Sequence, residues 1–188
     1  MKHREPEWAM VTVLFVDIRG FTSFADRATA RETVEYLNDF FATAVPVVEE
    51  HGGSVNKLLG DGFLAVFDTP DHADRALTAA ADLLAAFDGR YRVGIGINSG
   101  LVLIGTIGAG EVVELGVVGD PVNVAARVQD ATRELGEPLL LTDATRVLLD
   151  ADPGLEPRGA LDLHGKSEAT PVYSVTVPGR LARRKELR

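Results

Sequence analysis

Residues 56–67 read NKLLGDGFLAVF, and this stretch predicts a tight β-hairpin around which the fold can be built. The triplet Gly-Asp-Gly at 60–62 lies between two apolar runs, and both residue types accept the backbone conformations of a tight reversal. A turn requires neither Lys57 within the first apolar run nor Asp17 at the end of an apolar strand far upstream. We therefore expect Asp61 to do more than turn the chain.

The hydrophobic pattern on both sides of the hairpin alternates between strand-like and helix-like segments. Six segments read as strands or extended chain: 10–17, 54–59, 63–68, 91–98, 101–107 and 112–119. Ser99-Gly100 is expected to join the fourth and fifth as a turn. Two helices are predicted, at 30–50 and in the alanine-rich stretch that ends near Phe87. A third opens at Asp120-Pro121, with Asp120 as its N-cap and Pro121 in its first turn.

The order strand, helix, strand, strand, helix, strand is typical of a ferredoxin-like α+β fold. We expect a two-layer sandwich in which a mostly antiparallel sheet carries helices on one face. Short strands near 138–141 and 172–177 would extend the sheet. The predicted organisation is one domain over 10–177, with an N-terminal extension (1–9) and a basic C-terminal tail (178–188).

Composition limits the classes of function. The 188 residues, 46% hydrophobic and 25% charged, suit one soluble globular domain. A net charge of -9 argues against nucleic acid or an anionic membrane as the main partner, but permits a small anionic ligand where cations or backbone donors gather. The sequence has no cysteine, no signal peptide and no apolar run near the roughly 18 residues of a membrane span, so a cytoplasmic protein is the default expectation.

Two aspartates are candidate metal ligands. Asp17 ends the strand in LFVDIRGFT and Asp61 lies at the hairpin tip, so the sheet can bring their carboxylates together. A carboxylate pair without a nearby thiol or histidine is the ligand set that Mg²⁺ or Mn²⁺ prefers. The alternatives are an N-cap role for Asp17 at a short helix near Gly20 and a plain turn role for Asp61.

Two further segments could bind phosphate or sugar groups. The backbone N–H groups at Gly20, Phe21 and Thr22 follow a strand and open a short helix, which is a phosphate-binding geometry shared by many ordinary strand-to-helix turns. In GDPVNVAAR, Asn123 and Arg127 are four residues apart and share a helix face, where an amide and a guanidinium can hold a sugar oxygen and a phosphate. A solvated helix face is the alternative.

Two glycine-containing motifs do not meet the spacing of nucleotide-binding loops. HGKS at 164–167 has its upstream glycine one residue too far away for a phosphate-binding loop. GIGIN at 94–98 lacks the third glycine of the dinucleotide fingerprint. We reject both as nucleotide sites.

Four motifs occur in order: LFVDIRGFT, NKLLGDGFLAVF, RVGIGINSG and GDPVNVAAR. Together they closely resemble the catalytic domain of class III nucleotide cyclases, over about residues 11–177. The resemblance implies a homodimer packed head to tail with two composite sites, each converting ATP to cyclic AMP and pyrophosphate with two divalent cations, Mg²⁺ or Mn²⁺.

The same resemblance assigns roles to individual residues. Asp17, Asp61 and the backbone of Ile18 are similar to the ligands of the two cations. Asn123 resembles the residue that orients the ribose, and Arg127 the one that stabilises the transition state. The remaining matches are Lys57 to the adenine-contacting lysine and Arg92 and Lys166 to cations near the phosphates. By analogy, Asp17 and Asp61 of one subunit face Lys57, Asn123 and Arg127 of the other.

Gly116 departs from the family pattern. It lies seven residues before Asn123, where the family usually has the Asp or Thr that completes base recognition with the lysine. Lys57 can only donate, so the acidic residue that a guanine-reading site normally has at this position is missing too, and the site is of neither standard type. We expect an ATP-preferring cyclase with weakened activity or relaxed selectivity. The alternatives are a guanylyl or unselective cyclase, and a catalytically silent nucleotide-binding dimerisation module.

Overall fold

The computed structural model of the protein describes residues 5–109, 112–163 and 168–175. The strands within these ranges are β1 (Glu7–Ile18), β2 (Ser54–Leu58), β3 (Gly62–Phe67), β4 (Val93–Ala109), β5 (Val112–Val118), β6 (Leu139–Thr142), β7 (Leu155–Leu161) and β8 (Thr170–Val175). The helices are α1 (Phe21–Ala25), α2 (Ala30–Glu50), α3 (His72–Phe87), α4 (Asp120–Glu134) and α5 (Asp143–Arg146). The predicted basic tail and Lys166 lie outside the described residues.

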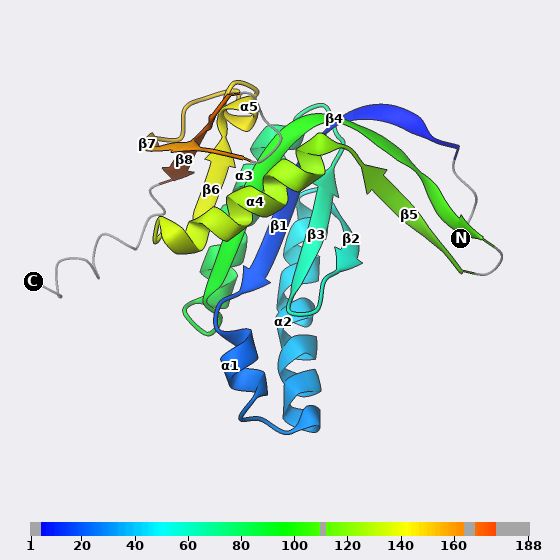
Figure 1. Cartoon of the computed structure of the whole chain (residues 1–188), viewed down its shortest axis with the longest axis vertical. Coiled ribbons are helices and arrows are strands. Elements are labelled where there is room, and N and C mark those ends of the chain that lie inside the picture. Colours follow the sequence, from blue (N-terminus) through cyan, green and yellow to red (C-terminus); the bar gives the residue numbers. More distant parts are fainter. Residues whose placement is uncertain (1–4, 110–111, 164–167, 176–188) are drawn as a thin grey trace, which may run out of the picture.

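One sheet organises the protein, with the strand order β2-β3-β1-β4-β6-β8-β7 and with β5 paired to β4 beyond this path (Figure 1). Every pairing is antiparallel except that of β4 with β6, which is parallel. The predicted hairpin around Asp61 is present as β2 and β3, closed by a hydrogen bond from Leu59 N to Gly62 O of 2.8 Å. Strand β1 begins three residues earlier than predicted, because residues 7–9 pair with β4.

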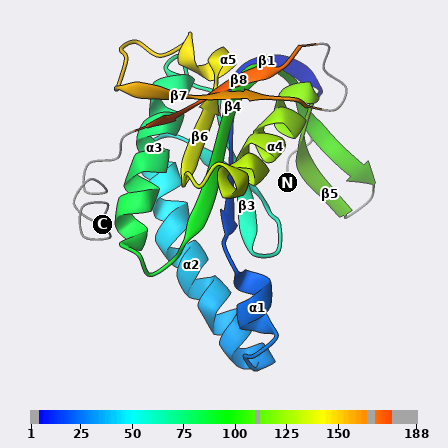
Figure 2. The ribbon, with the colours of Figure 1, turned by 60° about the vertical axis from the view of Figure 1, so that its left-hand side comes forward.

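Helices cover both faces of the sheet. Leu14, Ile95 and Ile97 point to the face covered by α2 and α3, in a core cluster with Phe40 and Leu83, and these two helices lie side by side in Figure 2. The alternate residues of β4 point to the opposite face, where α4 crosses the sheet (Figure 1). The α+β class and the mostly antiparallel sheet are confirmed. The expectation that all helices share one face is wrong, because α2 and α3 already fill the first face and α4 buries its apolar side on the second.

Strand β4 is one strand of 17 residues rather than the predicted pair of strands. Its register with β1 continues through the expected turn, where Ser99 lies opposite Thr12 and their hydroxyl oxygens are 2.7 Å apart. A Cβ on Gly100 would lie 2.5 Å from Cγ of Pro121 in α4. This glycine therefore permits close packing of a helix and does not turn the chain.

The helix limits follow local sequence signals closely. α2 begins and ends as predicted, and a capping box between Thr29 and Glu32 satisfies backbone donors at its start. Helix α4 starts at Asp120, but Gly119 is its N-cap and no side chain caps it, so the predicted capping role of Asp120 is wrong. Among the described residues we find no helix with the length and hydropathy needed to span a membrane.

Candidate active site

The two candidate metal ligands lie next to each other at one end of the sheet. Pairing of β1 with β3 places Asp17 opposite Gly62, the residue after Asp61. The N–H of Ile18 donates to the backbone carbonyl of Asp61 at 3.1 Å. A Cβ on Gly62 would lie 2.2 Å from the carbonyl oxygen of Val16, so only glycine allows the two strands to approach this closely. The sheet thus brings together the pair that the sequence separates by 44 residues.

Ionisation of the Asp17 carboxyl group is unfavourable in the folded protein. Burial raises its pKa from 3.8 to about 6, and the negative charges of Asp61 and Asp130 add to this effect. Arg133 and Arg19 act in the opposite direction but do not cancel it. A half-buried carboxylate facing a second carboxylate is stabilised when a cation binds between them.

The donor set fits a hard divalent cation. Asp17, Asp61 and the backbone of Ile18 offer oxygen ligands, and the described residues contain no group of three or more His, Cys, Asp or Glu side chains that could hold a metal. Mg²⁺ is usually held by one or two carboxylates and completes its shell with water and substrate phosphates. The described carboxylate pair could therefore hold a cation whose remaining ligands are water or other oxygen groups.

The strand-to-helix turn beside this pair is held in place by its arginine. Arg19 Nε donates to the carbonyl of Val93 at 3.0 Å, and its Nη2 donates to the carbonyls of Thr132 and Glu137 at 2.9 and 2.5 Å. The guanidinium of Arg19 thus donates to three backbone carbonyl groups. Arg92, which is exposed, accepts from Arg19 N through its carbonyl at 2.7 Å, so it lies at the same end of the sheet as Asp17.

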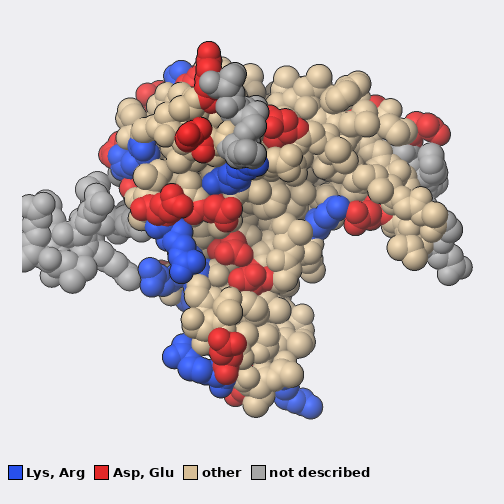
Figure 3. Space-filling view, in the orientation of Figure 1, with Lys and Arg blue, Asp and Glu red and all other residues tan. Residues whose placement is uncertain are grey.

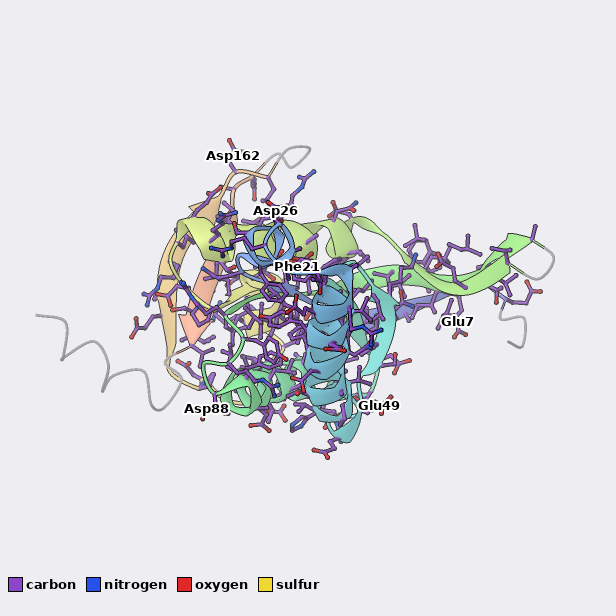
Figure 4. The ribbon with its side chains drawn as sticks, turned by 90° about the horizontal axis from the view of Figure 1, so that it is seen from below. Glu7, Phe21, Asp26, Glu49, Asp88 and Asp162 are labelled. Carbon is purple, nitrogen blue, oxygen red and sulfur yellow. The ribbon has the colours of Figure 1, made fainter. Side chains whose placement is uncertain are left out.

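The predicted phosphate-binding turn adopts the conformation that glycine favours. Gly20 has φ 78°, and no atom within 4 Å would obstruct a Cβ there, so the turn is open on that side. Phe21 packs its ring 6.3 Å from that of Tyr36, which fixes α1 against α2 (Figure 4). Thr22 follows in the first turn of α1 and is exposed.

Lys57 has a partner that the sequence did not suggest. Its Nζ lies 2.6 Å from Oε1 of Glu114 on β5, and the two side chains are 35% and 56% exposed, so a ligand can reach both. Glu114 and Gly116 are two residues apart on one strand and point to the same face. The sequence alone does not reveal this role of Glu114, because it depends on the register of β5. That register places the Glu114 carboxylate on the same face as Gly116, where a base-reading residue is expected.

Gly116 itself is covered by a neighbouring side chain. A Cβ at this position would lie 2.1 Å from Cδ1 of Ile107, the cross-strand partner of Glu114. Gly116 is buried, and Ile107 is 47% exposed. The space that an Asp or Thr side chain would use is therefore occupied by the end of Ile107.

Asn123 and Arg127 lie on the first half of α4, as predicted. Asn123 is exposed and Arg127 is half-buried, while Val124, Ala125 and Val128 between and after them face the core. The part of α4 that acts on Asp17 is the second half, through Asp130 and Arg133. At 1.5 Å per residue, Asn123 lies about 10 Å from Asp130 along the helix axis.

The predicted residues lie on several elements of the chain. Asp17, Asp61 and Arg92 share the end of the sheet near α1. Lys57 on β2 pairs with Glu114 on β5, and neither Lys57 nor Arg127 is among the described charges that shift the pKa of Asp17.

Comparison with known proteins identifies the family of this arrangement. The family model of the adenylate and guanylate cyclase catalytic domain matches residues 4–176. An adenylate cyclase of Anabaena cylindrica is 33% identical over 183 residues, which cover 88% of this chain and 36% of that protein. A terminal-differentiation-specific adenylate cyclase of Dictyostelium discoideum is 29% identical over 180 residues, covering 88% of this chain and 8% of that protein. The chain thus spans about a third or less of the length of these curated relatives.

Solved structures of both nucleotide specificities share the fold. A bacterial light-regulated adenylyl cyclase superimposes with a TM-score of 0.84 at 27% identity, covering 92% of this chain and 52% of that one. The guanylate cyclase domain of a Catenaria anguillulae protein in complex with GTP gives 0.80 at 26% identity, covering 94% and 99%. Since the family model spans nearly the whole sequence, the chain belongs to the class III adenylate and guanylate cyclase catalytic domains.

Proposed function

We propose that this domain converts ATP to 3',5'-cyclic AMP and pyrophosphate at composite sites formed by two copies packed head to tail. The observation that carries the proposal is the carboxylate pair, Asp17 with Asp61, held together at the end of β1 and β3 beside an open strand-to-helix turn. Two carboxylates and a backbone oxygen are a sufficient protein contribution to a metal–nucleotide site. The cytoplasmic location expected from the sequence stays a prediction.

The reaction needs positioning and charge neutralisation more than a protein nucleophile. The ribose 3'-oxygen attacks the α-phosphorus, the new O–P bond closes the ring, and the bond to the bridging oxygen breaks as pyrophosphate leaves. Asp17 and Asp61 would hold two divalent cations, Mg²⁺ or Mn²⁺, which when bound favour loss of the 3'-hydroxyl proton and neutralise phosphate charge. Arg127 would place a cation beside the phosphorus, and the Asn123 amide would hold the ribose.

The base would be read at β2 and β5. The Nζ of Lys57 can donate to N1 of adenine, which is an acceptor, but not to N1 of guanine, which carries a proton. Glu114, 2.6 Å from Nζ, can accept from the adenine 6-amino group in place of the side chain missing at Gly116. The pair can therefore satisfy both the acceptor N1 and the donor amino group of adenine.

Two copies are needed because the groups are separated in one. The cation-binding pair lies at the α1 end of the sheet, whereas Asn123 lies on the first half of α4, about 10 Å along the helix axis from Asp130, a residue that acts on Asp17. The surface shown in Figure 3 is largely uncharged over β3 and the β4–β5 hairpin, while acidic and basic groups gather around α4 and α1. An uncharged surface with charged groups at its edge suits association with a second copy.

A cyclase with relaxed base selectivity is the second candidate. Gly116 offers no side-chain acceptor, and Ile107 covers its position with an apolar group. Loss of one buried hydrogen bond would reduce discrimination by about one to two decades if nothing replaces it.

Initial rates of cyclic AMP and cyclic GMP formation test the proposal. We would measure them from ATP and GTP, with Mg²⁺ and Mn²⁺, over a range of protein concentrations. The expected result is cyclic AMP from ATP, at a specific activity that rises with concentration as dimers form. Equal rates with both nucleotides would favour the second candidate. No cyclic product from a folded dimer that binds nucleotide would refute both in favour of a silent module.

A further inference from the structure

Over residues 94–100, the face of β4 that contacts α4 has almost no side chains. The residues that point to it are Gly94, Gly96, Asn98 and Gly100, of which the first three belong to the GIGIN motif at 94–98. A Cβ on Gly96 would lie 2.2 Å from the backbone N of Gln129. At Gly100 it would meet Pro121 at 2.5 Å. We call these four positions the α4 seat, because the helix backbone lies directly on the strand there.

Asn98 is the only residue of the α4 seat with a side chain, because the other three are glycines. It is 4% exposed, and its Nδ2 donates to the carbonyl of Pro121 at 2.9 Å. Thr142 Oγ1 donates to its Oδ1 at 2.7 Å. Because the Pro121 carbonyl can only accept, the amide nitrogen has to face the helix, and Thr142 holds the amide in that orientation.

The bond from Asn98 fixes the start of α4. Gly119, the N-cap, supplies no side-chain hydrogen bond to this helix end. Pro121 lies in the first turn, two residues before Asn123 and six before Arg127. The glycines of the α4 seat allow close approach but offer nothing directional, so they restrict sliding of the helix along the strand less than a hydrogen bond does.

We propose that Asn98 is a positioning residue that sets the place of α4 along β4, and thereby the place of Asn123 and Arg127 in the active site. The inference rests on the proposed function, because it assigns a catalytic consequence to this anchor. A displacement of about 1 Å in a group that acts on the transition state can lower the rate by about two decades. Asn98 is buried and both ends of its amide hydrogen-bond to protein groups, so it acts through α4.

Asn98→Asp is the most informative variant. Aspartate is close to isosteric with asparagine, but one of its carboxylate oxygens would face the Pro121 carbonyl. These two hydrogen-bond acceptors would repel each other. We expect kcat with ATP to fall about 10- to 100-fold while KM stays within about threefold. Asn98→Ala, which removes the bond without repulsion, should fall between this variant and the wild type.

Ser99→Ala is the matched control. Ser99 is the next residue on β4, is 5% exposed, and bonds to Thr12 and Thr145 at 2.7 and 3.0 Å on the other face of the strand. Both variants lose buried hydrogen bonds of one strand, so both should lower Tm. Only the Asn98 variants should lower kcat beyond what their Tm explains. Equal losses of kcat in the two series would overturn the proposal.

Two further readouts separate positioning from general damage. In an Arg127→Ala background, Asn98→Asp should lower kcat much less than in the wild type, because the misplaced group is already absent. Hydrogen exchange should become faster at the amides of the second turn of α4, which donate to the carbonyls of its first turn, and not in the sheet. Additive losses, or exchange unchanged at α4, contradict the inference. A wild type without cyclase activity refutes the proposed function, and the exchange measurement then still tests the anchor.

Discussion

At the scale of single residues, Asp17 faces opposite requirements from stability and from cation binding. Its pKa of about 6 in the folded protein exceeds its ordinary 3.8, so the folded state holds a proton that the unfolded state has lost between these pH values. Above pH 6 the ionised carboxylate therefore destabilises the metal-free fold. The full difference corresponds to at most about 3 kcal/mol, and solvent screening at this half-buried site reduces it to about 1 kcal/mol.

Asp17→Asn should consequently raise Tm by about 2–4 °C at pH 7.5 in the presence of a chelator, with the gain shrinking as the pH falls below 6. With Mn²⁺ and a nucleotide the order should reverse, since only the wild type can bind the cation fully. Thermal unfolding at several pH values measures both effects. The exposed Asp68→Asn is the control and should change neither. A variant less stable than the wild type in chelator at pH 7.5 would contradict the assigned cost.

We expect Gly116 and Ile107 together to influence the selection between ATP and GTP. Gly116→Asp would restore an acceptor, but its Cβ would lie 2.1 Å from Cδ1 of Ile107, so Ile107 has to move. We expect the single variant to raise the ATP-to-GTP ratio of kcat/KM only slightly. Combined with Ile107→Ala, the rise should reach about tenfold. Ile107→Ala alone should leave the ratio unchanged, and a double variant with the wild-type ratio would remove Gly116 from base selection.

At the scale of elements, the packing of α4 on β4 depends on glycines that meet backbone atoms. A Cβ on Gly96 would lie 2.2 Å from Gln129 N and 2.6 Å from Ala125 O, and neither can move without shifting the helix. At Gly94 the obstruction is the side chain of Thr132, which can rotate. We therefore expect Gly96→Ala to cost about 3 kcal/mol and Gly94→Ala about 1 kcal/mol. Denaturant unfolding at constant m would show the order, and equal costs would contradict direct backbone contact.

At the scale of the whole molecule, the composite site predicts complementation between inactive variants. Asp17→Asn and Arg127→Ala should each lower activity by at least about two decades, because each breaks both sites of a homodimer. A mixture should regain up to about a quarter of the wild-type activity, since half of the random dimers contain one intact site of two. Mixing Asp17→Asn with Asp61→Asn is the control and should restore nothing. A mixture that stays inactive, from chains shown to exchange, would place the whole site in one protomer.

The sequence by itself determined the features that depend on neighbouring residues. The Gly-Asp-Gly hairpin, the limits of α2 and the placing of Asn123 with Arg127 on one helix follow from turn chemistry, capping and a 3.6-residue period, which act over a few residues. The apolar runs before Asp17 and after Asp61, which form parts of β1 and β3, belong to the same class of signal.

Only the tertiary structure decided the features that depend on distant partners. Ser99-Gly100 has turn-like composition but continues a strand, because Thr12 pairs with one residue and Pro121 packs on the other. The pairing of Lys57 with Glu114 and the raised pKa of Asp17 arise in the same way, from strands and charges brought together by the sheet. Hydrogen bonding, burial and charge interactions depend on distance in space, and a local pattern of residue types does not contain that distance.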